Sequence, residues 1–310
     1  MKKLLCLILT LLLLTGCAPK EQIVEGDPAL SFTDSTGYFV TAPNEPKTVA
    51  VLLSSYAEVW TLAGGTVSVT VGETVDRGIV SQGVTLVDGG AGKTIDQELL
   101  LAAKPDFVIG SADIPAQVEA CKAAREAGIS AALFRMDDFQ DYLRMLDIFT
   151  MITGDDSAYD THGHQVQQRI EEVKSQTASQ TTDPKKILFI RAGSQYASTK
   201  AKRAPDNFVC TMLEELGAQN IADAAPILLD GLSLEEIITQ DPDHIFLTTM
   251  GDEAAAKSYI QDLFAQEGWR DLTAVREGDY TFLSKDLFHY KPNARWAEAY
   301  ETLASILYPT

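Results

Sequence analysis

Eight residues with side chains suited to holding a ligand follow predicted strands, at or near the point where each strand ends. They are Ser54, Tyr56, Ser111, Arg135, Arg191, Tyr196, His289 and Tyr290. In open α/β sheets, ligands bind beyond the carboxyl ends of the strands. Guanidinium groups at such ends pair bidentately with carboxylate or catecholate oxygens. These residues therefore form the candidate binding site.

The two arginines indicate the charge of the ligand. The chain has 25 Lys and Arg against 44 Asp and Glu, for a net charge of −19. A cationic site in an acidic protein favours an anionic ligand, whereas the overall charge argues against nucleic acid as a partner. The alternative is that Arg135 and Arg191 pair with nearby carboxylates such as Asp137 or Asp138. The sequence leaves both interpretations open.

Direct binding of a metal ion is predicted less clearly. His162-Gly163-His164 resembles a metal-binding pair, but residues two apart on a helix point to different faces. His244 begins a predicted strand and is interpreted as a structural histidine. His289 could ligate haem iron, with a tyrosine such as Tyr56, Tyr196 or Tyr290 as the second ligand. It could equally be a wall residue that only donates a hydrogen bond, so no metal site is predicted unless the ligand is haem.

No catalytic residue or cofactor is predicted. The sequence contains neither Gly-x-Ser-x-Gly nor His-Glu-x-x-His. Residues 89–94, Gly-Gly-Ala-Gly-Lys-Thr, resemble the end of a nucleotide-binding P-loop, but that motif needs a glycine where Val87 stands. We therefore expect a binding protein, with an extracytoplasmic hydrolase as a weaker alternative.

The N-terminal residues have the pattern of a secretory leader. Lys2 and Lys3 precede an apolar run, residues 4–14, that is too short to span a bilayer. The run ends in Leu14-Thr15-Gly16-Cys17, which resembles the lipobox of bacterial lipoproteins. That resemblance implies lipidation of Cys17 and attachment to the extracytoplasmic face of the bacterial cell membrane through the lipid alone. The alternative is a plain secretory signal cleaved nearby.

Short apolar runs alternate with helical patterns over the rest of the chain. Runs at 48–53, 67–71, 84–87, 107–110 and 130–134 are followed by a second series at 186–191, 244–248 and 280–283. Such alternation is typical of an α/β protein with mainly parallel sheets. Between the series, residues 155–179 show one helical period and no strand signal. The predicted organisation is a signal peptide at 1–16, a lipidated tether at 17–33, a first lobe at 34–152, a linker helix at 153–180 and a second lobe at 181–310.

A short motif occurs once in each predicted lobe. Glu98 stands seven residues before Pro105, and Glu235 stands seven residues before Pro242. Each Glu opens a short helix that is followed by a Pro-Asp turn and a buried strand. The chain is thus expected to contain two similar lobes, each with a carboxylate on a matching helix.

Several motifs together carry a resemblance to a known family. They are Thr33-Asp34 with Gly37, Ser54-Ser55-Tyr56-Ala57-Glu58, Lys104-Pro105-Asp106, residues 216–221, Leu232-Ser233-Leu234-Glu235, Asp241-Pro242-Asp243 and residues 288–296. Their order resembles that of the substrate-binding lipoproteins of ABC importers for iron-siderophores, haem and cobalamin. The resemblance implies two Rossmann-like lobes joined by one long helix, with the ligand in a cleft between them.

The resemblance also implies a function and partners. Proteins of this family capture a metal chelate and deliver it to a permease dimer that has cytoplasmic ATPase subunits. They act as monomers and dock through one carboxylate per lobe, which here correspond to Glu98 and Glu235. The alternative is that each Glu only favours its helix dipole. The charge favours a ferric siderophore as the ligand, with haem or cobalamin as alternatives, and a related zinc- or manganese-binding lipoprotein as a weaker one.

Overall fold

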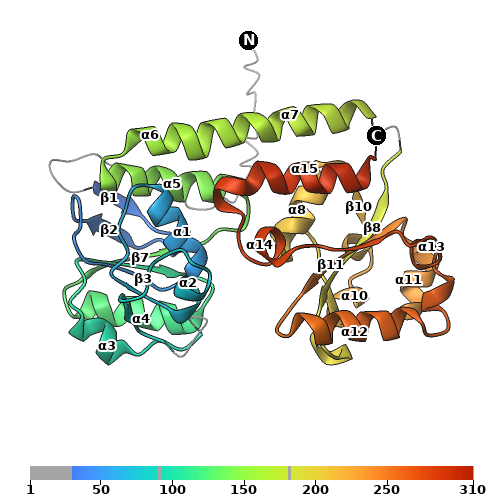
Figure 1. Ribbon diagram of the computed structural model, residues 1–310, viewed down its shortest axis with the longest axis horizontal. Coiled ribbons are helices and arrows are strands. Elements are labelled where there is room, and N and C mark those ends of the chain that lie inside the picture. The colour runs from blue at the N-terminus through green and yellow to red at the C-terminus, as the bar shows by residue number, and fades with distance from the viewer. Residues whose placement is uncertain (1–29, 89–92, 181–182, 310) are drawn as a thin grey trace, which may run out of the picture.

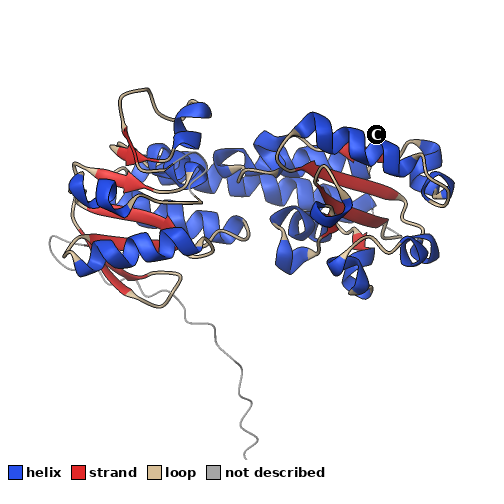
Figure 2. Cartoon of the chain, turned by 90° about the horizontal axis from the view of Figure 1, so that it is seen from below, coloured by secondary structure: helices blue, strands red, loops and turns tan. Residues whose placement is uncertain are grey.

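The computed structural model describes residues 30–88, 93–180 and 183–309. Figure 1 shows two α/β lobes side by side beneath a long helix, with the C-terminal helix running beneath that helix. Figure 2 shows that the strands of each lobe form a sheet of their own. None of the helices in the described ranges is both long enough and apolar enough to span a membrane.

The first lobe is built on a five-stranded parallel sheet. Its strands are β3 (Val49–Val51), β4 (Val69–Thr70), β5 (Thr85–Leu86), β6 (Phe107–Ser111) and β7 (Ser130–Phe134), in the order β5-β4-β3-β6-β7. Its helices are α1 (Ser54–Leu62), α2 (Gly72–Asp76), α3 (Gln97–Ala102), α4 (Pro115–Glu126) and α5 (Phe139–Thr153). The central strands β3 and β6 are fully buried, as expected when helices cover both faces of a parallel sheet.

A hairpin precedes this sheet and corrects one predicted boundary. Strands β1 (Leu30–Thr33) and β2 (Phe39–Ala42) pair in antiparallel register, and Phe32 is completely buried. Residues 30–33 therefore belong to the folded first lobe and not to the tether predicted at 17–33.

The second lobe repeats this architecture with one antiparallel strand. Its strands are β8 (Lys186–Ala192), β9 (Lys200–Ala201), β10 (Gln219–Asn220), β11 (His244–Thr249) and β12 (Tyr280–Phe282). The parallel order is β10-β8-β11-β12, and β9 pairs antiparallel with β8. Its helices are α8 (Phe208–Glu215), α9 (Ile221–Ala224), α10 (Ile227–Asp230), α11 (Leu234–Gln240), α12 (Glu253–Phe264), α13 (Thr273–Glu277), α14 (Lys285–Phe288) and α15 (Trp296–Leu307). The predicted α/β class with mainly parallel sheets is confirmed.

The linker helix contains one wide turn. It consists of α6 (Asp156–Tyr159), a π-helical turn (Asp160–His164) and α7 (Gln165–Gln180), and Asp155 caps its N-terminus by accepting from the Ala158 N–H. Gly163 is buried in the wide turn, where a Cβ would lie 3.3 Å from Leu143. The Tyr142 hydroxyl donates to the His162 carbonyl at 3.0 Å. The wide turn is therefore fixed to helix α5 of the first lobe.

The two lobes share part of their core. One apolar cluster runs from the first lobe through Val166 and Ile170 of the linker helix into the second lobe. At its centre the Trp296 ring contacts Phe139 of the first lobe at 6.0 Å and Phe208 of the second at 5.4 Å, between ring centroids. Because packed cores resist deformation, this continuity favours a fixed orientation of the lobes.

Candidate functional site

Arg191 lies near the carboxyl end of the central strand β8. It pairs in register with Thr248 of β11, and its chain neighbours Ile190 and Ala192 point into the second-lobe core on the opposite face. The Arg191 side chain is half-buried, and no hydrogen bond or ion pair to its guanidinium is found in the parts of the chain that the structure describes. Burial lowers its pKa, because no carboxylate compensates the charge. The Arg191 guanidinium is therefore available to pair with an anionic ligand.

His289 and Tyr290 follow helix α14, and Arg191 lies close enough to His289 for its charge to act on the imidazole. Their rings meet edge to face with centroids 5.2 Å apart. The pKa of His289 is lowered first by burial and then by the positive charges of Lys285 and Arg191. Its imidazole is therefore neutral at pH 7 and can offer a lone pair. Lys285 donates to the Gly251 carbonyl at 2.8 Å, which holds a further positive charge at this edge of the sheet.

The first lobe presents an ion-pair network to the same region. Arg77, which follows helix α2, donates to Glu58 at 2.9 Å and to the Ser54 hydroxyl at 3.1 Å. Ser54 in turn donates to Glu73 at 2.5 Å. The Arg77 guanidinium also stacks over the Tyr290 ring of the second lobe, 4.2 Å from its centroid. The candidate site is therefore bordered by both lobes.

Three predicted site residues are enclosed and do not face open space. Ser54, Tyr56 and Ser111 are 0%, 2% and 3% exposed. The Tyr56 hydroxyl donates to the Phe134 carbonyl at 3.1 Å, and burial raises the pKa of that hydroxyl. The Ser111 hydroxyl accepts from the Asp113 N–H. The prediction that Tyr56 contacts the ligand is wrong for this structure, because helix α1 starts at Ser54 and the Tyr56 side chain packs in the core.

Arg135 and Tyr196 also differ from the expected arrangement. Arg135 donates to Asp113 at 2.8 Å and lies 3.8 Å from Asp137, so it forms the local ion pairs that were its alternative interpretation. These carboxylates raise the pKa of Arg135. Tyr196 is 55% exposed, and its hydroxyl lies where it would contact a Cβ at Gly231. Of the eight predicted site residues, Arg191, His289 and Tyr290 therefore remain as the candidate ligand-binding group.

Glu98 and Glu235 are exposed in the first turns of α3 and α11. Neither carboxylate forms an ion pair within the described part of the chain. The helices match closely, because Leu100 and Ile237 are both fully buried and the residues before each proline, Lys104 and Asp241, have φ values of 47° and 42°. Both carboxylates are free to meet a partner.

The remaining predicted features concern histidine, cysteine and the leader. The described residues hold no group of three or more His, Cys, Asp or Glu arranged to bind a metal ion. His244 is structural, as expected, since its Nε2 hydrogen-bonds to the Thr281 hydroxyl at 3.0 Å. Cys17 and the glycine-rich residues 89–92 lie outside the described residues.

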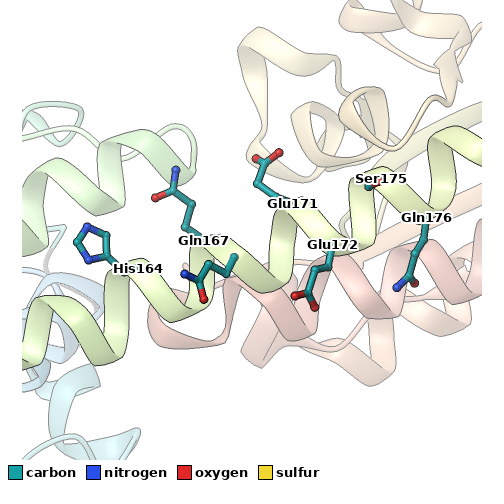
Figure 3. A pocket seen from close by; sticks show the side chains of 7 residues that line it. His164, Gln167, Glu171, Glu172, Ser175 and Gln176 are labelled. Atoms are coloured by element: carbon teal, nitrogen blue, oxygen red, sulfur yellow. The ribbon is translucent and has the colours of Figure 1, made fainter.

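A hollow of about 660 Å³ lies elsewhere, on the linker helix. Figure 3 shows polar side chains projecting from one long helix around it. The described lining is His164, Gln167, Gln168, Glu171, Glu172, Ser175 and Gln176. Because these residues lie away from the strand ends, this hollow is a surface feature of the linker and not the candidate site.

The sequence matches a known family over most of its length. Residues 49–287 match the family described as periplasmic binding protein. The chain belongs to the periplasmic binding protein family. This membership confirms the predicted resemblance and the prediction that the chain is not an enzyme, because the family is defined by binding. Among curated proteins, none matches the sequence significantly.

Solved structures of bacterial proteins share the fold of this periplasmic binding protein. An ABC transporter substrate-binding protein from Listeria monocytogenes is 15% identical with a TM-score of 0.69, covering 86% of this chain and 100% of its own. A periplasmic binding protein from Veillonella parvula is 17% identical with a TM-score of 0.71, covering 96% of each chain. Staphylococcus aureus SirA complexed with staphyloferrin B is 16% identical with a TM-score of 0.67, covering 90% of this chain and 97% of its own. Identities this low establish the shared fold alone.

Sequence reasoning missed three charged residues of this periplasmic binding protein's candidate site. Arg77 and Glu73 lie on or just after α2, and Lys285 begins α14. None of them directly follows a strand, which was the signal used to find site residues. Arg191 and Lys285 come near the same histidine, His289, only through tertiary packing, which a local sequence pattern cannot predict.

Proposed function

We propose that this protein is the substrate-binding lipoprotein of an ABC importer. It captures an anionic iron chelate, with a ferric siderophore as the best fit, between its lobes and delivers it to a permease dimer driven by cytoplasmic ATPase subunits. It acts as a monomer on the extracytoplasmic face of the bacterial cell membrane, anchored through Cys17. Membership of the periplasmic binding protein family supports this proposal, as do solved relatives of the same fold whose names include a transporter component and a staphyloferrin B complex.

One observation carries the choice of an anionic ligand. Arg191 is half-buried without a carboxylate partner in the described ranges, although the whole chain has a net charge of −19. The positive charges of Arg191 and Lys285 both act on the donor-capable His289. An uncompensated guanidinium is costly to bury, and an anionic ligand offsets that cost. A ferric siderophore with carboxylate or catecholate groups supplies such an anion.

Docking on the permease is assigned to Glu98 and Glu235. Both are exposed on matching helices without an internal ion pair in the described parts of the chain. Two unpaired carboxylates in equivalent positions suit a partner made of two similar subunits, each offering a positive side chain.

Haem is a second candidate because of His289. His289 keeps a solvent-exposed surface although the surrounding protein lowers the pKa of its imidazole, and no hydrogen bond to its ring is found within the described residues. A neutral imidazole is the form that ligates haem iron. Arg191 would then face a haem propionate.

Binding of a defined panel tests the proposal. The mature chain is titrated with ferric citrate, a ferric tris-catecholate, a ferric trihydroxamate, haemin, cobalamin, and uncomplexed Fe³⁺, Zn²⁺ and Mn²⁺, with calorimetry and visible spectra as readouts. Tight binding of an anionic ferric chelate is expected, and a shifted Soret band would instead assign haem. Binding of uncomplexed ions alone, or of none of the panel, would overturn the proposal.

A further inference from the structure

The lobes meet through a short segment that begins inside the candidate site. Residues 290–293, which we call the crossing segment, follow His289 directly and contact the first lobe at three points. The Tyr290 ring lies under Arg77 at 4.2 Å. The Lys291 N–H donates to the Ser55 hydroxyl at 3.4 Å, and the Asn293 side-chain amide donates to the Ser55 carbonyl at 2.9 Å. The segment thus joins a second-lobe site residue to the start of helix α1.

Arg77 is the first-lobe residue best able to fix this segment. Its side chain is only 16% exposed, and the carboxylate of Glu58, 27% exposed, compensates its charge at 2.9 Å. The Ser54 hydroxyl accepts from a second guanidinium nitrogen. With its edge held by these two groups, the planar face of the guanidinium is left to stack on Tyr290. A cation held over an aromatic ring is attracted most strongly where water is excluded.

We propose that Arg77 is a positioning residue for ligand capture. By stacking on Tyr290 from across the lobe boundary, it holds the His289–Tyr290 corner beside Arg191. This inference rests on the proposed function, since it concerns the same binding site. It adds that affinity depends on a first-lobe residue that does not itself touch the ligand.

The geometry explains how the effect reaches the ligand. The His289 and Tyr290 rings pack edge to face, and the N–H groups of both residues donate to the Lys285 carbonyl at 3.0 Å. A shift of Tyr290 therefore moves His289 and the end of helix α14 together. Arg191 is on strand β8 and does not follow this movement. Loss of the stack on Arg77 would thus separate groups that must meet one ligand.

The chain contains a matched control contact within one lobe. Arg125 stacks over Tyr38 at 3.8 Å and pairs with Asp34 at 2.6 Å. It has the same kind of contact, a guanidinium held by a carboxylate over a tyrosine ring, with 15% of its side chain exposed. Both partners belong to the first lobe, so Arg125→Lys tests the loss of such a contact without affecting the lobe boundary.

The experiment compares affinity and backbone protection in variants. Arg77→Lys keeps the charge but loses the planar stack, Tyr290→Leu removes the ring, and Tyr290→Phe retains it. Affinity for ferric citrate, the ferric tris-catecholate and haemin is measured by calorimetry. We expect Arg77→Lys and Tyr290→Leu each to weaken binding by about five- to thirtyfold, and the double variant to lose no more than either one. Arg125→Lys should bind as the parent does, whereas Tyr290→Phe is assessed only by hydrogen exchange of the crossing segment, where it should match the parent.

Hydrogen exchange of residues 289–291 without ligand supplies an independent readout. Faster exchange is expected in Arg77→Lys and Tyr290→Leu and parent-like exchange in Arg125→Lys. If the parent binds none of the probes, the proposed function fails, but the exchange result still decides whether Arg77 holds the crossing segment. Additive losses in the double variant, exchange in Tyr290→Phe as fast as in Tyr290→Leu, or unchanged exchange in Arg77→Lys would each overturn the inference.

Discussion

Asp106 and Asp243 make the same contact in the two lobes. The Asp106 carboxylate accepts from the backbone N–H of Thr48, and that of Asp243 accepts from Lys186, both at 2.8 Å. Their own N–H groups donate back to the carbonyls of the same residues, at 2.7 and 2.8 Å. Each aspartate therefore ties the turn after a short helix to the start of its lobe's first central strand. The helices that carry Glu98 and Glu235 are thus fixed in equivalent ways.

Reversing both of these exposed charges should separate docking from ligand capture. Glu98→Arg combined with Glu235→Arg is expected to leave chelate affinity unchanged and to reduce stimulation of the transporter ATPase by about tenfold or more, since each new arginine would oppose a positive permease residue. Reconstituted transporter in lipid vesicles gives the readout. Glu119→Arg with Glu267→Arg, one exposed residue per lobe, is the charge-matched control. Equal losses of affinity and stimulation would place the two glutamates in the binding site.

Removing the unpaired guanidinium should weaken binding of an anionic chelate. Arg191→Ala is expected to reduce affinity by about ten- to a hundredfold, since a charge-assisted hydrogen bond away from water is worth about 1.5–3 kcal/mol. Arg169→Ala serves as a control, because Arg169 forms an exposed ion pair with Glu301 at 2.7 Å. Calorimetric titration checks both. Parent-like affinity of Arg191→Ala for every chelate would remove Arg191 from the site.

The half-buried imidazole of His244 should make the fold less stable in mild acid. Burial lowers its pKa from 6.5 to about 4. Between these values the unfolded chain binds a proton that the native state does not, so the free energy of unfolding decreases as the pH falls through this range. With allowance for partial exposure, we expect a loss on the order of 1–2 kcal/mol. Urea unfolding at pH 7 and pH 4.5 should show a smaller loss in His244→Asn than in the parent.

Replacing Cys17, the proposed lipidation site, should change the location of the protein. Lipidation of Cys17 would supply two acyl chains, which are enough for stable anchoring. Cys17→Ser is therefore expected to move the protein from the membrane fraction to the soluble fraction. Cell fractionation followed by a high-salt wash checks this, with Cys121→Ser as a control because that thiol is buried in the first lobe. Continued retention of Cys17→Ser would contradict lipid anchoring.

Ligand should bring the lobes only slightly closer together. Trp296 packs between Phe139 and Phe208, and the linker helix shares the same apolar cluster. A continuous core of this kind opposes large hinge motion. Small-angle scattering with and without the tightest-binding chelate is expected to show a change in radius of gyration of less than about 1 Å. A larger decrease would show that the shared core yields on binding.

The sequence allowed the sheets to be predicted well because buried parallel strands are apolar on both faces. The runs at 107–110 and 130–134 became β6 and β7 with little change in their bounds. The succession of short helix, Pro-Asp turn and strand in each lobe was also predicted correctly, because Pro105 and Pro242 mark the two turns. The strand Leu30–Thr33 was missed because its four residues, with a single fully buried apolar side chain at Phe32, carry little signal.

Side-chain direction was the part that the sequence could not supply. The expectation that ligands bind beyond the carboxyl ends of strands drew attention to Tyr56. Its side chain nevertheless points into the core, because helix α1 begins at Ser54, soon after strand β3 ends. In the sequence, Arg135 and Arg191 have the same position relative to a strand end. Only the folded structure shows that Asp113 forms an ion pair with Arg135. Arg77 and Tyr290 are far apart in the sequence and follow different helices, so their stack could not be predicted from any local pattern.

The wide turn at Asp160–His164 lies between the two parts of the linker helix that pack on different lobes. An α-helix rotates by about 100° per residue, and a π-helical turn holds one residue more than an α turn. The helix before it packs on α5 of the first lobe, and the helix after it packs on α15 of the second. Deleting Gly163 would therefore rotate the helix after the turn relative to α5 and disturb the core that the two lobes share. A change of one residue in chain length at this turn would therefore disturb the relative placement of Glu98 and Glu235 on which the proposed docking depends.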